Sequence, residues 1–209
     1  QVAFRAPNLL QNLLGEGTIS AAFIPIYSRF LDEGRPKAAA RFAGAVFGLL
    51  CVVVALVALV GMTLAEPIVA VLAPGYVSDA ARVAAGRLDV NRFELAVQAV
   101  RIIFPMTGVL VLSAWALGIL NSHRQFFVPY VAPVLWNVAI IGTLGGGAYL
   151  LSGTPGAPTA LTGDALSQLL LVACFGALAG GVLQMGVQLP FVWQHLDHLK
   201  IAVSTRVEG

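Results

Sequence analysis

Long stretches of this chain contain no charged side chain, and this feature limits the folds that the chain can adopt. Asp, Glu, Lys and Arg are absent from residues 42–65, 102–123, 125–163 and 165–196. Charged residues make up 11% of the chain, against roughly 25% in a typical soluble domain. A helix crosses a bilayer with about 20 apolar residues, whereas a soluble core of this size has no reason to exclude charge from such long windows. The sequence therefore predicts a membrane protein.

We expect an all-α polytopic fold in a single transmembrane helical domain, 1–209. Its five predicted spans lie at about 3–30, 42–65, 97–120, 126–151 and 161–192. Five spans put the two ends of the chain on opposite sides of the membrane. Because the chain also begins at Gln1 without an initiator Met, we expect a fragment that lacks at least one preceding span.

The connector 66–96 is the longest segment between predicted spans. Asp79 is suited to the cap or first turn of a helix that runs into the third span. The apolar positions that follow do not repeat cleanly, because Gly86 intervenes. A short interfacial helix is the favoured interpretation, and an irregular surface loop is the alternative.

The distribution of basic residues predicts an orientation. Arg and Lys concentrate in cytoplasmic loops of membrane proteins. On one side of the predicted topology the chain carries three, which are Arg82, Arg87 and Arg92. The other side carries seven and is expected to be cytoplasmic, so the N-terminus faces outward; the seven are Arg29, Arg35, Lys37, Arg41, Arg124, Lys200 and Arg206.

The first predicted span is unusually polar. It contains Asn8, Gln11, Asn12 and Glu16, with a glycine on each side of the glutamate. Burying a carboxylate and amides in hydrocarbon costs several kcal/mol unless they meet water, partners or a ligand. We therefore expect this segment to line a polar cavity, and a cavity inside a membrane bundle indicates transport.

Other polar groups in or near the spans have competing interpretations. Arg101 is either an anion-binding donor or an interface arginine whose head group reaches water. Gln184 and Gln188, one turn apart, are either cavity donors or partners in hydrogen bonds between helices. Two glycine clusters, 145–147 and 180–181, predict close helix packing.

The chain shows no sign of catalytic or metal chemistry. It contains no P-loop, catalytic triad or paired-carboxylate motif, so we expect neither an enzyme nor a cofactor. His195 and His198 are three residues apart but lack an evident third ligand, which favours surface positions over a metal site. Cys51 and Cys174 lie in mid-span, where packing is the expected role.

Four segments resemble the MurJ/MviN family of lipid II flippases. The first is RAPNLLQNLLGEGTISAAFIPIY, which is similar to the second transmembrane helix of that family. The likeness continues through Ala73–Pro74–Gly75–Tyr76, through 101–138 and through GGVLQMGVQLP at 180–190. The series covers nearly the whole chain in the order expected for the second to sixth helices.

The resemblance implies a fold and a function. Family members are fourteen-helix proteins of the multidrug/oligosaccharidyl-lipid/polysaccharide exporter superfamily, in the bacterial cytoplasmic membrane. They move lipid II, the undecaprenyl-pyrophosphate-linked peptidoglycan precursor, from the inner to the outer leaflet by alternating access between two lobes. This chain would form most of the amino-terminal lobe. Its partners would be lipid II, membrane lipids, and the first helix and carboxy-terminal lobe of the same protein, with no nucleic acid.

The resemblance also indicates residues of the cavity. Asn8 occupies the polar position of the PNLL motif, with Arg5 just before it, and Asn137 matches a polar position that faces the cavity. Some members have paired arginines after PNLL, where this chain has Gln11 and Asn12. This difference removes two positive charges that elsewhere could meet the pyrophosphate.

Glu16 has two interpretations that the sequence leaves open. Its carboxylate could form part of a cytoplasmic gate, against a basic group, a cation or a proton. Alternatively it caps a helix that resumes at 18–20.

Two other functions compete with the flippase. One is a related exporter of a different lipid-linked saccharide or of a drug. The other is a membrane scaffold that does not transport.

Overall fold

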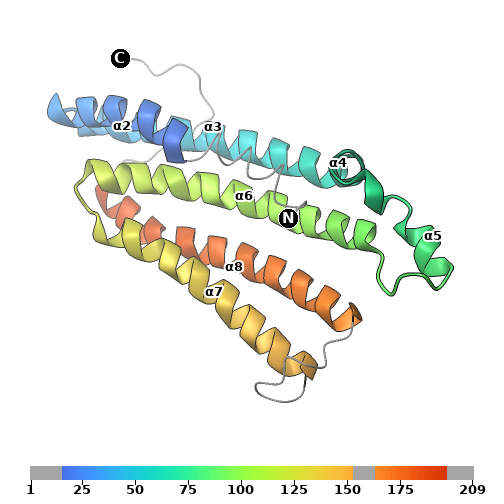
Figure 1. Cartoon of the computed structure of the whole chain (residues 1–209). Coiled ribbons are helices and arrows are strands. Elements are labelled where there is room, and N and C mark those ends of the chain that lie inside the picture. Colours follow the sequence, from blue (N-terminus) through green and yellow to red (C-terminus); the bar gives the residue numbers. More distant parts are fainter. Residues whose placement is uncertain (1–15, 153–162, 197–209) are drawn as a thin grey trace.

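The computed structural model describes residues 16–152 and 163–196. Within these residues every regular element is helical and no strand occurs. The elements are α2 (Glu16–Asp32), α3 (Pro36–Thr63), α4 (Ala65–Leu72), the 3-10 turn η1 (Pro74–Tyr76), α5 (Asp79–Ala84), α6 (Arg92–Ser122), α7 (Phe127–Ser152) and α8 (Gly163–His195). The long helices lie side by side as a bundle, with α6 between α3 and α8 (Figure 1). The prediction of an all-α fold is confirmed.

Four helices of the described part are long and apolar enough to cross a membrane: Pro36–Thr63, Arg92–Ser122, Phe127–Leu151 and Gly163–His195. They coincide with four of the five predicted spans. The first of them begins at Pro36, before the predicted bound at 42, because proline fits well into the first turn of a helix. The remaining span, predicted at about 3–30, is described from Glu16 onward as α2, and its first half lies outside the described residues.

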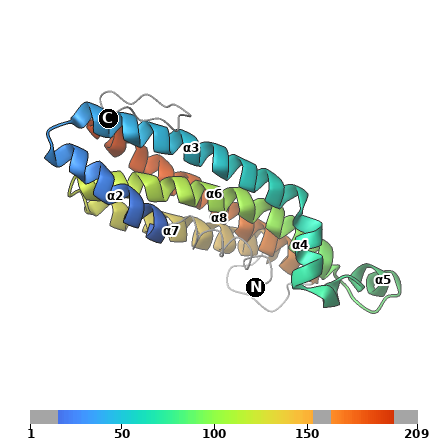
Figure 2. The same ribbon diagram turned by 90° about the horizontal axis from the view of Figure 1, so that it is seen from above.

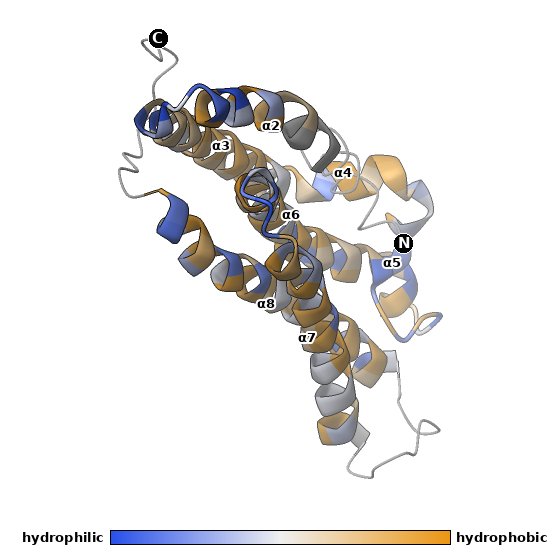
Figure 3. Cartoon of the chain, turned by 90° about the vertical axis from the view of Figure 1, so that its left-hand side faces the viewer, coloured by the Kyte–Doolittle hydropathy of each residue, from blue (hydrophilic) through white to orange (hydrophobic). Residues whose placement is uncertain are grey.

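The bundle is polar at both ends and hydrophobic in between. The α2–α3 and α6–α7 turns lie at one end, whereas α4 and α5 lie at the other (Figures 1 and 2). Hydrophobic residues run along α3 and α6, and hydrophilic residues gather at the α2–α3 turn and around α5 (Figure 3). Five of the seven basic residues assigned to the cytoplasmic side are in the described part, in or near the α2–α3 and α6–α7 turns. The assignment of that end to the cytoplasm stays a prediction.

Helix α6 is the centre of the bundle. It packs against α2, α3 and α4 and also against α8. In its most apolar 18-residue window 67% of the residues are buried, against 17% in the windows of α3 and α7. A helix that is apolar on all sides is suited to such a position. Trp115 of α6 fixes the α3 side, because its Nε1 donates a hydrogen bond to the carbonyl of Ala43 at 3.2 Å.

Small residues allow α7 and α8 to approach closely. A Cβ atom at Gly176 would overlap the side chain of Thr143, and one at Gly180 would lie 2.7 Å from Cδ1 of Trp136 and 3.0 Å from its carbonyl oxygen. Trp136 is itself held, because its Nε1 donates to the carbonyl of Ala177 at 2.9 Å. Close packing is therefore confirmed at Gly180 of the second predicted glycine cluster, whereas a Cβ atom at Gly181 would make ordinary contacts of 3.8 Å with side chains of α6.

The first glycine cluster behaves differently along its length. A Cβ atom at Gly147 would lie 3.0 Å from Cγ1 of Val172, so this glycine is part of the α7–α8 contact. A Cβ atom added at Gly145 or at Gly146 would meet no other atom within 4 Å. The expectation of close packing is thus wrong for these two within the described chain, because they point away from α8.

The connector before α6 is fastened by one buried carboxylate. Asp79, the first residue of α5, accepts hydrogen bonds from Nε of Arg92 at 2.7 Å and from Nη2 at 3.0 Å. The Arg92 guanidinium also lies over the ring of Tyr76. These hydrogen bonds hold the pKa of Asp79 below its usual range. The contact is therefore complete at neutral pH and weakens only as the pH falls through that lowered pKa.

The predicted short helix in this connector is confirmed as α5, with Asp79 in its first turn. It does not continue into the third span, however. The helix ends at Ala84, Gly86 adopts a φ of +66°, and α6 starts separately at Arg92. The Asn91 side chain caps this new start by accepting a hydrogen bond from the Glu94 amide at 3.3 Å.

The two glycine environments generate a matched prediction. In the full-length protein, Gly180→Ala should lower stability by about 1–3 kcal/mol, because the backbone carbonyl of Trp136 cannot move aside easily. Gly146→Ala makes the same chemical change on α7 where space is open, and it should leave stability unchanged or slightly raised. The thermal unfolding midpoint of each purified variant in detergent tests this. Equal midpoints would contradict the packing described here.

Candidate functional site

Most of the predicted cavity residues lie outside the part of the chain that the structure describes. These are Arg5, Asn8, Gln11 and Asn12. Glu16 is the first residue of the described α2, and its side chain is outside the described positions. The structure therefore shows how α2, which follows these residues in the sequence, is held, and where Asn137 lies.

Aromatic side chains pack the second half of α2 against α3 and α6. Phe23 and Tyr27 are 3% and 1% exposed. The Phe23 ring stacks on Tyr27 and on Phe42 of α3, with centroids 5.3 and 5.5 Å apart. A Cβ atom at Gly118 of α6 would lie 3.2 Å from Phe23, so that glycine leaves room for the ring. Close packing on both α3 and α6 thus fixes the position of α2.

A polar cluster adds to this contact at the end of the bundle that is predicted to be cytoplasmic. The Tyr27 hydroxyl and Nε2 of His123 form a hydrogen bond at 3.0 Å. His123, just after α6, stacks on His195 in the last turn of α8, with centroids 4.1 Å apart and an interplanar angle of 10°. The cluster therefore joins the ends of α2, α6 and α8.

The sequence favoured a surface position for His195, but the structure half-buries the rings of both His123 and His195. Burial lowers the pKa of His123, and the nearby His195 lowers it further. Within the described residues no group of three His, Cys, Asp or Glu side chains is placed to hold a metal ion. The spacing between positions 123 and 195 gave no signal of this pairing, since it arises only when α6 and α8 end side by side. His198 lies outside the described residues.

Asn137 is exposed on α7. Its Nδ2 donates to the carbonyl of Pro133 one turn earlier, at 3.1 Å, and its neighbours Val134 and Val138 are 55% and 58% exposed. The described helices leave this amide on an open face of α7. Asn137 lies on a helix that packs mainly on α8, whereas the described part of α2 packs on α3 and α6.

Gln184 and Gln188 lie inside the contact between α6 and α8. Ser113 Oγ donates to Oε1 of Gln188 at 2.8 Å, and Nε2 of Gln184 donates to Ser113 Oγ at 3.1 Å. All three residues are buried. The interpretation as hydrogen bonds between helices is therefore confirmed. Nε2 of Gln188 is buried without a hydrogen-bond partner among the described residues.

Arg101 is engaged at the opposite end of the bundle. Its Nη2 donates to Oε1 of Glu66 at 3.1 Å, and both side chains are substantially exposed. This pair joins α4 to α6. Arg101 is thus neutralised by a carboxylate, which makes it a weak candidate for binding a phosphate.

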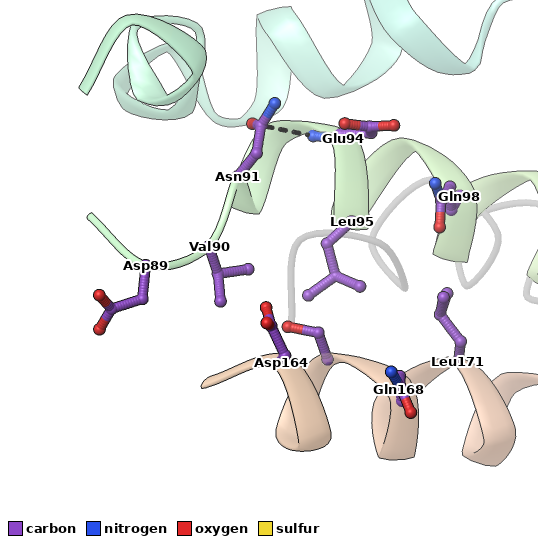
Figure 4. Close-up of a pocket in the computed structure, with 10 residues that line it drawn as sticks. Asp89, Val90, Asn91, Glu94, Leu95, Gln98, Asp164, Gln168 and Leu171 are labelled. Carbon is purple, nitrogen blue, oxygen red and sulfur yellow. Dashed lines mark hydrogen bonds between the residues drawn. The ribbon is translucent and has the colours of Figure 1, made fainter. Parts of the chain in front are cut away.

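An open pocket lies where α6 and α8 begin (Figure 4). Its volume is about 340 Å³, and its polar lining is acidic or amide in character. The pocket was not predicted, although the acidic residues Glu94 and Asp164 near the start of two spans were a possible signal. Carboxylates near helix N-termini are favoured by the helix dipole, and such a lining repels anions. The lining residues are Asp89, Val90, Asn91, Glu94, Leu95, Gln98, Asp164, Ser167, Gln168 and Leu171.

Comparison with known proteins gives a consistent result. The family model described as "Lipid II flippase MurJ" matches residues 1–209. The chain is 34% identical over 206 residues to "Probable lipid II flippase MurJ" of Rhizobium tropici, covering 98% of this chain and 34% of that protein. It is 33% identical over 189 residues to "Lipid II flippase MurJ" of Burkholderia cenocepacia, covering 90% and 32%. With the Rhizobium meliloti relative it shares 30% over 206 residues, covering 98% and 34%.

The chain spans about a third of the length of these relatives. Within that third, the match runs the whole length of the chain and agrees with a bundle of membrane-spanning helices. The chain belongs to the MurJ family of lipid II flippases.

Proposed function

We propose that the full-length protein containing this chain moves lipid II from the inner to the outer leaflet during cell wall biosynthesis. The observation that carries the proposal is the family match over residues 1–209, together with four helices suited to crossing a membrane. Members of this family are multi-pass proteins of the bacterial cytoplasmic membrane. Transport of this kind changes the leaflet of the substrate and breaks no covalent bond.

In this proposal the chain forms most of one lobe of an alternating-access transporter, as a single helical domain. The compact packing around α6 supports a lobe that moves as a unit, since α2, α3 and α8 all pack on that helix. The other lobe and the preceding helix would come from the rest of the full-length protein.

The substrate sets chemical demands that the chain meets in part. A pyrophosphate requires cationic groups or several N–H donors. We assign these contacts to Arg5, Asn8, Gln11 and Asn12, with Asn137 as a further donor. Its exposed amide supports the assignment, because an amide facing hydrocarbon would be costly. We assign no phosphate contact to Arg101, because it is paired with Glu66.

The competing functions receive less support. Each curated relative reported above is described as a lipid II flippase, whereas an exporter of another saccharide or of a drug would be expected to match other families. A scaffold without transport would have no need of a polar first span.

The direct test is complementation. Bacteria depleted of their own lipid II flippase should regain growth, and lipid II in the outer leaflet, when they express the full-length protein. An inactive but inserted membrane protein from another family serves as the control. Failure of both readouts despite normal insertion would reject lipid II as the substrate.

Glu16 allows a sharper test of the cavity. In the full-length protein, Glu16→Gln should lower flipping by about tenfold, equivalent to about 1.4 kcal/mol, while protein abundance falls less. The reason is that a gating carboxylate acts through its charge, which glutamine lacks. Asp32→Asn removes an exposed carboxylate from the last residue of the same helix and should leave flipping unchanged. Parallel losses of flipping and abundance in Glu16→Gln would favour the helix-capping role instead.

A further inference from the structure

The cluster of Tyr27, His123 and His195 joins three helices through a hydrogen bond and a stacked pair of imidazole rings. The hydrogen bond from α2 reaches His123, and His123 stacks face to face on His195 of α8. Tyr27 also meets the edge of the His123 ring, with centroids 5.8 Å apart. Histidine is the side chain whose ordinary pKa allows it to change charge between about pH 5 and pH 8.

The surroundings of the His123 imidazole favour its neutral form, because burial and the neighbouring His195 ring lower its pKa. Nε2 of His195 is buried and has no hydrogen-bond partner among the described residues. No described carboxylate forms an ion pair with either ring. Two protonated rings at this stacking distance would repel each other.

Other charged groups at this end of the bundle are screened by water. The titratable side chains in direct contact with the His123 ring are Tyr27 from α2 and His195 from α8. Arg124 follows His123 directly and is exposed. The remaining described charged residues of this end are also exposed and lie in α2, in the α2–α3 turn and at the start of α3; they are Arg29, Asp32, Glu33, Arg35, Lys37 and Arg41.

One factor opposes the neutral state. His123 and His195 both lie at the C-terminal ends of helices, where the helix dipole favours positive charge. Burial and the neighbouring ring outweigh this effect at His123, because its pKa is lowered. The folded contact is therefore complete above the ordinary pKa of histidine and weakens as the pH falls through the lowered value.

We propose that Tyr27, His123 and His195 form a proton-sensitive latch that holds the end of α2 against α6 and α8 and releases it when the imidazoles are protonated. Tyr27 and the two histidines are positioning residues in this scheme, since they fix α2, which follows the polar segment in the sequence. The consequence for transport rests on the proposed function. Release of α2 would change the geometry of the cavity entrance at the predicted cytoplasmic face.

The latch is tested by a distance measurement that needs no transport. Spin labels are placed on cysteines introduced at Asp32 and Gln194, which are exposed near the ends of α2 and α8. A cysteine-free background of the full-length protein in lipid nanodiscs is used. Between about pH 7.5 and pH 5.5, the population with the longer distance should rise by roughly threefold or more.

Variants separate the latch from general loosening. His123→Gln stays neutral and can still bond Tyr27, so it should hold the short distance at both pH values; His195→Gln should do the same. Tyr27→Phe should raise the long-distance population already at the higher pH. Tyr130→Phe makes the same change at an exposed tyrosine of α7 and should behave as the parent protein does.

Two results would overturn the latch. One is an unchanged distance distribution across the pH range in the parent protein. The other is a pH response that survives in both His123→Gln and His195→Gln. Either result leaves the flippase proposal intact, whereas failed complementation with a normal pH response would reject the flippase and keep the latch.

Discussion

The burial of α6 on all sides is the constraint on which the rest of the described structure depends. In lipid, burying apolar surface gives little drive for association, so helices adhere through close packing and hydrogen bonds. Helix α6 supplies both. Trp115 donates a hydrogen bond to the α3 backbone, and Ser113 forms hydrogen bonds with the buried glutamines of α8. Gly118 leaves room for the Phe23 ring of α2. The other helices are positioned by these contacts.

This arrangement separates structural polar groups from functional ones. Gln184 and Gln188 are used within the bundle, and Arg101 is paired with a carboxylate. Asn137 differs, because its amide is left on an open face of a membrane-spanning helix. Most of the described polar side chains in the middle of the membrane thus hold helices together. We propose that the remaining polarity, in the first span and at Asn137, faces the substrate.

Much of the fold could be predicted from the sequence, because long windows without charge indicate membrane spans and because proline and glycine mark the ends of helices. Four spans were predicted in this way, and so was a short helix at Asp79. Contacts between distant residues could not be predicted. The pairing of His123 with His195 and the burial of Asp79 by Arg92 depend on which helix ends meet. Likewise, two glycines of one cluster proved open because helix rotation, rather than composition, decides which face packs.

We propose that the polar groups not used between helices, in the first span and at Asn137, face water and substrate rather than lipid, and cysteine labelling at Asn137 tests this most directly. In the full-length protein, Asn137→Cys should react with a water-soluble maleimide roughly tenfold faster than Val138→Cys, because the thiolate forms only where water reaches. Added lipid II should protect the cysteine at position 137. Equal, slow labelling at both positions, without protection, would place this face of α7 against lipid and contradict the account.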